Sequence, residues 1–275
     1  FNKEDVISLI KMIVMDLDGT LLNKERKVSK KSRDYLKKLK DMGYIIVVAS
    51  GRIYESINYT IDNFECVNYV ITDTGASCYD TCDGHTIFNN PIELDIAKKF
   101  QKFYDDNCIF IDVCDKHTIY KYSDIDENYY FIDTTKDWDY IFNNCKEVSH
   151  ISISMKTNEH VMELYNKLQE EDISELYINI MQDSFDDRKW IEIIKKGCTK
   201  YKAIADLANY LNINNDEIIA FGDGLNDIDM LKNCGTGVAL SNALPTVKEI
   251  SNFVTVYDHN HDGVTEFLKE YLNVE

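Results

Sequence analysis

The sequence predicts an α/β protein with a doubly wound, mostly parallel sheet into which a second, α+β domain is inserted. Three short apolar runs, at 12–15, 44–49 and 68–72, alternate with two stretches of helical spacing. This is the pattern of a parallel β-α-β-α-β unit with right-handed crossovers. From residue 91 the strands change to alternating apolar and polar residues, which favours an antiparallel sheet. The pattern of short, mainly apolar runs returns at Trp190.

These changes of pattern divide the chain into three segments. We predict that residues 1–90 and 190–275 form one domain and that residues 91–189 form the inserted domain. The run WIEII at 190–194 is expected to be a strand of the first domain, because it is apolar at four of five positions. No internal repeat or low-complexity linker separates the segments.

Local signals place the elements between the apolar strands. Ser29 is expected to cap a helix that ends at Gly43, and Asp83-Gly84 to form the turn of a hairpin. Asn90 is expected to cap the next helix, with Pro91 in its first turn. The inserted domain then shows strands at 108–114, 117–123, 148–155 and 176–181 and a helix near 158–170. The last segment shows a helix from Thr199, a strand at 217–221 and two further strand and helix units.

Composition narrows the classes of partner. The 275 residues include 30 Lys and Arg against 48 Asp and Glu, so the net charge of −18 disfavours nucleic acid and anionic membranes. No apolar run approaches the roughly 18 residues of a membrane span. The eight cysteines contain no CxxC pair, which favours free thiols in a reducing, cytoplasmic compartment. The chain opens on Phe1, which leaves room for an upstream leader, and nothing in it predicts the oligomeric state.

Two carboxylates follow the first apolar strand. Asp16 and Asp18 would share one face of an extended chain, and Gly19 would allow a sharp turn beneath them. Two carboxylates on one side of a turn repel each other unless a cation or a proton lies between them. An isolated DxDG of this kind is more often a solvated turn, so the motif needs support from elsewhere in the chain.

That support is a second acidic cluster after the strand at 217–221. Asp223, Asn226 and Asp227 would lie at the same carboxyl edge of a parallel sheet as the first cluster. Carboxylates that converge on one crevice need a hard divalent cation, and oxygen ligands suit Mg²⁺. An EF-hand is excluded, since its sixth loop position requires glycine where the two clusters carry Leu21 and Ile228.

Four ordered motifs together resemble the haloacid dehalogenase-like hydrolase superfamily, and within it the Cof-type phosphatases with a large α/β cap. The motifs are DLDGTLL at 16–22, Ser50-Gly51-Arg52, Lys200 in GCTKYKAI, and GDGLND at 222–227. GVALSNA at 237–243 and Asp262-Gly263-Val264 also match the C-terminal pattern of that superfamily. The resemblance spans nearly the whole chain. It implies a Rossmann-like core and identifies the insertion at 91–189 as the cap domain.

The resemblance also assigns roles to individual residues. It implies that Asp16 attacks phosphorus and that Asp18 protonates the leaving alcohol and then activates water. Asp223, Asp16 and the backbone carbonyl of Asp18 would hold Mg²⁺. Phosphoryl oxygens would be bound by Ser50 and Lys200. In the remaining roles, Gly51 and Arg52 would lie at the substrate, and Asn226 and Asp227 would orient Lys200 or metal-bound water.

Two residues depart from the pattern of the family. Thr74 stands where relatives carry Asn in an Asn-Gly-Ala sequence, and Tyr201 replaces the glycine that follows the motif lysine. Taken singly, a lysine such as Lys200 is more often a solvated helix residue than a ligand of phosphate. A serine such as Ser50 is as often a helix cap as a functional residue. The His259-Asn260-His261 sequence is more often a wet loop than a metal site.

We therefore expect a Mg²⁺-dependent phosphatase of small phosphorylated metabolites, with sugar phosphates first among them. The enzymatic alternative is a phosphomutase of the phosphomannomutase type, which has a similar core and cap. A third reading is a catalytically silent metal-binding regulatory module. The joint presence of Asp16, Asp18, Lys200 and Asp223 argues against this last reading.

Overall fold

In the computed structural model, the described residues are 10–61, 65–125, 129–171, 173–182 and 187–274. They form two compact units, each with its own sheet. The first unit comprises Phe1–Gly51, Asn58–Phe88 and Thr199–Glu275, and the second comprises Arg52–Ile57 and Asn89–Cys198. The chain therefore leaves the first unit twice and returns to it twice.

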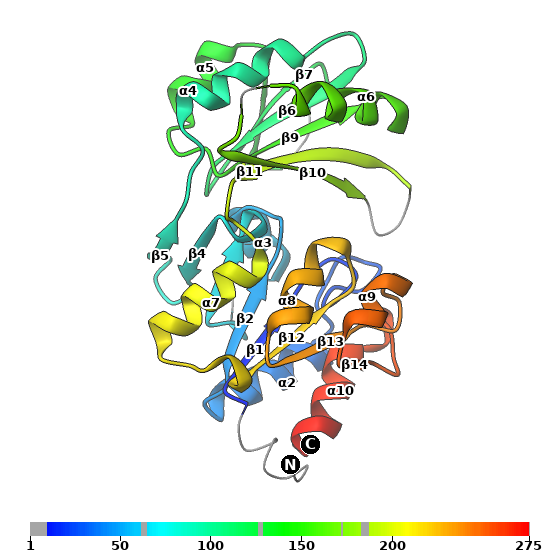
Figure 1. The fold of residues 1–275 in the computed structure, drawn as a ribbon. Helices are drawn as coiled ribbons and strands as arrows, with labels where there is room; N and C mark the ends of the chain where they lie inside the picture. Colours follow the sequence, from blue (N-terminus) through cyan, green and yellow to red (C-terminus); the bar gives the residue numbers. More distant parts are fainter. Residues whose placement is uncertain (1–9, 62–64, 126–128, 172, 183–186, 275) are drawn as a thin grey trace. The chain divides into compact units, whose positions relative to one another are not determined.

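The first unit is built on an eight-stranded sheet in the order β14-β13-β12-β1-β2-β3-β4-β5 (Figure 1). The pairs from β14 to β3 are parallel, and β4 pairs antiparallel with β3. The strands are β1 Met12–Met15, β2 Ile45–Ala49, β3 Tyr69–Thr72, β4 Ser77–Asp80, β5 Thr86–Asn89, β12 Ile218–Gly222, β13 Thr236–Ala239 and β14 Phe253–Val254. The prediction of a mostly parallel sheet is confirmed.

The register of the central strands brings their carboxyl ends to one edge. Met15, the last residue of β1, lies opposite Phe221 of β12 and Val48 of β2. The turns that follow these strands therefore emerge side by side. The strands are buried on both faces, which is why their sequences are continuously apolar rather than alternating.

Helices cover both faces of this sheet. Apolar residues of α7, α8 and α9 pack with those of β1, β2, β12 and β13 in one core cluster. On the other face α10 contacts α2, and Phe267 of α10 meets Phe221 edge to face. The helices of this unit are α2 Lys30–Asp41, α7 Lys200–Leu211, α8 Ile228–Asn233, α9 Pro245–Ile250 and α10 Gly263–Leu272, with short 3-10 turns at Asp73–Gly75, Asn215–Glu217, Leu225–Asp227 and His259–His261. The helix α3 Tyr54–Ile61 is divided between the two units after Ile57.

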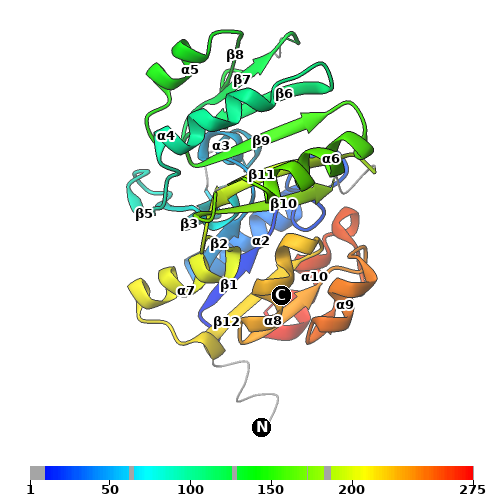
Figure 2. The same cartoon turned by 45° about the horizontal axis from the view of Figure 1, so that its top comes forward.

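The second unit is a six-stranded sheet in the order β10-β11-β9-β6-β7-β8. Its pairs are antiparallel except β7 with β8. Figure 2 shows α4, α5 and α6 over one face, where their apolar residues form a single core with the strands. The elements are α4 Leu94–Ala97, a 3-10 turn Lys98–Phe103, β6 Cys108–Cys114, β7 Ile119–Ser123, β8 Ile132–Thr135, α5 Trp138–Asn144, β9 His150–Met155, α6 Asn158–Gln169, β10 Leu176–Gln182 and β11 Lys189–Lys195.

Two local predictions are wrong. The run at 190–194 is indeed a strand, but as β11 it pairs antiparallel with β10 and β9 in the second sheet, not in the first. Ile191 and Ile193 belong to the core of the second unit, so apolar character alone did not identify the sheet of this strand. The helix expected at Asn90 begins only at Leu94, because Ile92 first forms an isolated bridge with Val148.

The helix starts predicted at Ser29 and Thr199 are confirmed. Ser29 accepts a hydrogen bond from Ser32 N at the start of α2, and Thr199 accepts one from Lys202 N at the start of α7. Thr199 thereby fixes the first turn of the helix that carries Lys200.

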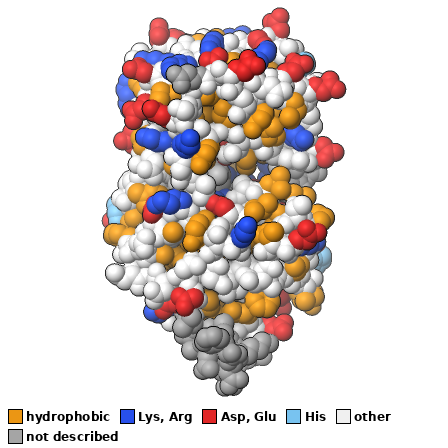
Figure 3. Space-filling view, viewed as in Figure 1, with side chains coloured by type: hydrophobic (Ala, Val, Ile, Leu, Met, Phe, Trp, Pro, Cys, Tyr) orange, Lys and Arg blue, Asp and Glu red, His pale blue; other side chains and the backbone are white. Residues whose placement is uncertain are grey.

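The surface carries charge of both signs. On the face drawn in Figure 3, acidic and basic side chains are interspersed rather than separated into single-sign areas. Among the helices of the described residues, none combines the length and the apolar character needed to cross a membrane.

We predict that Gly237→Ala destabilises the first unit, because a Cβ at this position of β13 would overlap the backbone carbonyl oxygen of Leu231 in α8. The backbone oxygen cannot move without separating α8 from the sheet, so we expect a loss of about 2–3 kcal/mol in the free energy of unfolding. Urea denaturation measures it. Gly43→Ala is the control: its surroundings are open, and only its positive φ, a strain of about 1 kcal/mol, opposes the substitution.

Candidate active site

The turn after β1 places two carboxylates at the carboxyl edge of the sheet. Asp16 is buried, and its backbone N donates to Phe221 O of β12 at 3.0 Å. Asp18 is half-buried. Gly19 has a φ of 79°, and a Cβ on it would overlap the carboxylate of Asp223. Glycine is therefore required here both by the left-handed backbone and by the close approach of the second acidic turn.

A fully buried lysine joins the two acidic turns. Lys200 is the first residue of α7 and has 0% of its surface exposed. Its Nζ donates to Asp16 Oδ1 at 2.7 Å and to Asp227 Oδ1 at 2.6 Å. Short bonds between charged groups in a dry environment are strong, and they fix both partners. The lysine motif thus meets the first and the fourth motifs directly.

The turn after β12 is held by its own carboxylate. Asp227 Oδ2 accepts hydrogen bonds from the backbone N of Asp223 and of Gly224, both at 2.9 Å. Asp227 is buried, and each of its carboxylate oxygens has a partner. Asp223 receives a bond from the first turn, because Thr20 Oγ1 donates to its Oδ1 at 2.8 Å.

The carboxylates of this cluster, when ionised, carry more negative charge than Lys200 alone balances. Burial raises the pKa of Asp16 well above its ordinary value, and the charge of Lys200 opposes this effect. Burial, together with the charge of Asp227, raises the pKa of Asp223 to about 7. Burial lowers the pKa of Lys200, but the charges of Asp16 and Asp227 outweigh it, so the net pKa is raised. One ammonium faces three carboxylates, which leaves an excess of buried negative charge.

The donor set fits a hard divalent cation. One oxygen from each of Asp16, Asp223 and Asp227 lies within 4.8 Å of the others. Because Asp227 already serves Lys200 and two backbone N–H groups, Asp16 and Asp223 are the carboxylates best placed to bind an ion. Oxygen-only ligands of this type suit Mg²⁺.

Ser50 is connected to the cluster by a strained turn. It is buried after β2, and its carbonyl accepts from Thr74 N at 3.1 Å. Asp73, Thr74 and Gly75 have φ values of 52°, 54° and 101°, and a Cβ on Gly75 would overlap the carbonyl of Thr199. Left-handed backbone at a β-branched residue costs roughly 1–3 kcal/mol. The departure at Thr74 therefore lies where the loop links Ser50 to the start of α7.

The structure brings together most of the residues expected from the sequence. Asp16, Lys200, Asp223 and Asp227 are in direct contact or share partners, as described above. Asn226 lies half-buried in the second acidic turn, but the Nζ of Lys200 bonds to Asp16 and Asp227 instead. Gly51 belongs to the first unit, and Arg52, its neighbour, to the second.

One contact was not anticipated from the sequence. The DLDGTLL motif includes Thr20, but the motif alone predicts no partner for its hydroxyl. Its position next to Gly19 was the available signal, since a hydroxyl there can reach a neighbouring carboxylate.

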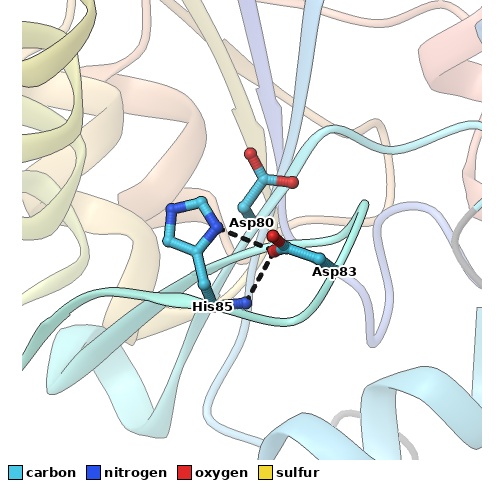
Figure 4. A group of neighbouring side chains, drawn as sticks. All are labelled: Asp80, Asp83 and His85. Atoms are coloured by element: carbon cyan, nitrogen blue, oxygen red, sulfur yellow. Dashed lines mark hydrogen bonds and ion pairs between the residues drawn. The ribbon is translucent and has the colours of Figure 1, made fainter.

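A second acidic group lies on the β4–β5 hairpin (Figure 4). Asp80, Asp83 and His85 also place ligand atoms within 4.8 Å of one another, but Asp83 and His85 are exposed. Asp83 Oδ1 accepts from the backbone N of His85 at 2.9 Å and lies 2.7 Å from its Nδ1. These are contacts of an ordinary polar turn, and they explain the group without a ligand.

Comparison with known proteins gives a consistent result over nearly the whole chain. Residues 13–268 match the family described as haloacid dehalogenase-like hydrolase. The chain is 28% identical to the 5-amino-6-(5-phospho-D-ribitylamino)uracil phosphatase YitU of Bacillus subtilis, with 96% of this chain and 98% of that protein covered.

Solved structures agree. TM0651 from Thermotoga maritima is 26% identical, with a TM-score of 0.77 and coverage of 95% of this chain and 97% of that one. BT1666 from Bacteroides thetaiotaomicron, described among the phosphatases of the HAD superfamily, is 26% identical with a TM-score of 0.75, covering 96% and 95%. The resemblance inferred from the four motifs is confirmed.

We predict that Lys200→Met destabilises the protein by about 3–5 kcal/mol at pH 8, because it leaves two buried carboxylates without their cation. Without the ammonium the folded-state pKa of Asp16 rises further, so stability is lost as pH rises through that pKa and recovered below it. Urea denaturation at about pH 5.5 and about pH 8 should show the larger deficit at the higher pH.

Lys202→Met is the matched control for this change. Lys202 lies in the same helix and pairs with Asp206, but it is exposed, so we expect a loss of about 0.5 kcal/mol or less. Equal losses for the two variants, or a deficit at Lys200 that does not change with pH, would contradict the assignment of a buried charge cluster.

Proposed function

This chain belongs to the haloacid dehalogenase-like hydrolases and is a phosphatase of that family, and from this premise we propose a Mg²⁺-dependent hydrolysis of small phosphorylated metabolites. The observation that carries the proposal is the Lys200 ammonium, which lies 2.7 Å from Asp16 and 2.6 Å from Asp227 beside Asp223. On this proposal, the nucleophile, the phosphate-binding cation and a metal-binding carboxylate lie together at one edge of the sheet.

Asp16 is the proposed nucleophile. Its carboxylate oxygen forms a bond to phosphorus while the bond from phosphorus to the ester oxygen breaks, which gives an aspartyl-phosphate and an alcohol. Asp18, two residues further on, donates its proton to the leaving oxygen. It then accepts a proton from the water that attacks the aspartyl-phosphate, which restores Asp16 and releases phosphate.

Positive charge around the transferred group is the second requirement. In phosphoryl transfer the protein contributes mainly positioning and electrostatic stabilisation of the equatorial oxygens. Lys200 and Ser50 would bind these oxygens. Asp16, Asp223 and the backbone carbonyl of Asp18 would hold Mg²⁺, which when bound neutralises negative charge on the phosphoryl group.

The second unit is proposed as the cap that selects the substrate and excludes water during the reaction. The proposed cap consists of the predicted segment 91–189, extended at its end to include β11. Sugar phosphates are the first candidates for the substrate. The relative YitU is named for a substrate with a phosphorylated ribityl chain, which has the same polyhydroxylated character.

We predict that the protein releases phosphate from at least one member of a panel of phosphorylated sugars, nucleotides and vitamin precursors, including the substrate named for YitU. Asp16→Asn should lower turnover about 10⁴-fold or more, because the amide cannot serve as the nucleophile. Asp34→Asn, an exposed position on α2, should leave turnover unchanged. Phosphate release with and without EDTA is the measurement.

Each outcome of this experiment is informative. If the wild type and Asp16→Asn are equally inactive on every compound, the hydrolase assignment fails. Transfer of phosphate to a second sugar hydroxyl without release would favour the phosphomutase alternative. Full turnover in EDTA would contradict the proposed metal ligands.

We further predict that stabilisation by Mg²⁺ depends on pH. The pKa of Asp223 in the metal-free protein is about 7, above its ordinary value of 3.8, so the folded state holds the extra proton between these values. Stability of the metal-free protein therefore falls as pH rises through about 7, and Mg²⁺ must displace the proton below it. The shift in Tm on adding MgCl₂ should be larger at about pH 8 than at about pH 5.5. A shift independent of pH, or one retained in Asp223→Asn, would argue against Asp223 as a ligand.

A further inference from the structure

The segment Leu240–Leu244, which follows β13, bonds to both acidic turns. Its backbone N–H groups donate to the turn after β12: Leu240 N to Gly222 O at 3.1 Å and Leu244 N to Asp223 O at 3.3 Å. Its side chain at Asn242 reaches the turn after β1, where Nδ2 donates to Gly19 O at 2.8 Å. The segment therefore connects the ends of three neighbouring strands, β13, β12 and β1.

The amide of Asn242 is itself held in place. Its Oδ1 accepts from His259 N at 3.1 Å, in the 3-10 turn His259–His261. That turn also contacts the loop after the first motif, because Asn260 Oδ1 accepts from Lys24 N at 2.7 Å. The His259-Asn260-His261 sequence thus supports the loop between residues 19 and 24 through backbone and amide hydrogen bonds.

The carbonyl of Gly19 is a sensitive point of the site. Gly19 has positive φ, is in close contact with Asp223, and lies between Asp18 and Thr20, the residue that donates to Asp223. Rotation of the peptide bond after Gly19 would move the hydroxyl of Thr20, and with it the carboxylates of Asp18 and Asp223. A bond that fixes the Gly19 carbonyl therefore fixes the spacing of the two acidic turns.

We propose that Asn242 is a positioning residue for phosphoryl transfer, which sets the separation of Asp16 and Asp223 by holding the Gly19 carbonyl. An amide is needed because the role requires a donor toward Gly19 and an acceptor toward His259 on the same side chain. The inference rests on the proposed function for its kinetic readout, and on the hydrogen bonds themselves for its structural one.

The test compares two variants that separate these bonds. Asn242→Ala loses both bonds, whereas Asn242→Asp can still accept from His259 N but cannot donate to Gly19 O. We expect both to lower kcat/KM about 10- to 100-fold. We also expect faster hydrogen exchange in a peptide spanning residues 17–22, whose amides at Thr20, Leu21 and Leu22 all donate to Leu17 O.

The matched control is Asn252→Ala. Asn252 also bonds to the backbone of a glycine, but its Oδ1 accepts from Gly237 N at 2.7 Å, and the bond lies beside β13 and β14 rather than at the acidic turns. This variant should keep the wild-type kcat/KM and the wild-type exchange in 17–22. A general loss of stability would instead affect both asparagine positions alike.

The inference is overturned if both Asn242 variants match the wild type in kcat/KM, or if their kcat/KM falls with unchanged exchange in 17–22. A kinetic loss in Asn242→Ala that Asn242→Asp fully restores would also overturn it, since the contact with His259 would then suffice. If the wild type hydrolyses no compound, the proposed function fails by itself. The exchange measurement then decides alone whether Asn242 holds the turn.

Discussion

The ion pairs of Lys200 with Asp16 and Asp227 join parts of the chain that local folding could not bring together. Lys200 lies 184 residues after Asp16 and 27 residues before Asp227, and all three are buried. Carboxylates buried this close to one another would repel strongly, and the ammonium makes their approach tolerable. The close packing of Gly19 against Asp223, and the bonds from Asp227 to its own turn, depend on this compensation.

Parallel pairing supplies the geometry in which this interaction can form. Because β1, β2, β12 and β13 run in one direction, their polar ends meet at a single edge, and each needs only a short turn to reach the others. The chain accepts local strain to complete the arrangement. Left-handed backbone from Asp73 to Gly75 connects Ser50 with the start of α7, and such conformations persist only where surrounding contacts determine them.

Much of this arrangement was predictable from the sequence, because its signals are local. The apolar runs identified every strand of the parallel core, and Ser29 and Thr199 marked the starts of α2 and α7. The approach of Asp223 to Asp16 followed from the rule that parallel strands end at one edge, whereas Lys200 was assigned to the site only by the resemblance to the family. The rule predicts which strand ends lie near one another, and this was sufficient to predict the acidic cluster.

Other features depended on partners that a single sequence does not show. The run at 190–194 is apolar enough for either sheet, and only its pairing with β9 and β10 decides between them. The hydroxyl of Thr20 and the amide of Asn242 act across 203 and 223 positions of sequence. Their roles depend on the orientation of one side chain, which neither periodicity nor spacing encodes.

The insertion of β12 next to β1 has a consequence for how the protein is made. During synthesis β1 can pair with β2 early, but its other edge waits for β12, which follows about 200 residues later. At about 5–20 residues per second a ribosome needs roughly 10–40 s to supply it. Over that interval the nascent chain presents an apolar strand with one open edge, and until residue 200 is added the nearby carboxylates also lack their lysine. We therefore expect the nascent chain to bind a chaperone before its last third emerges.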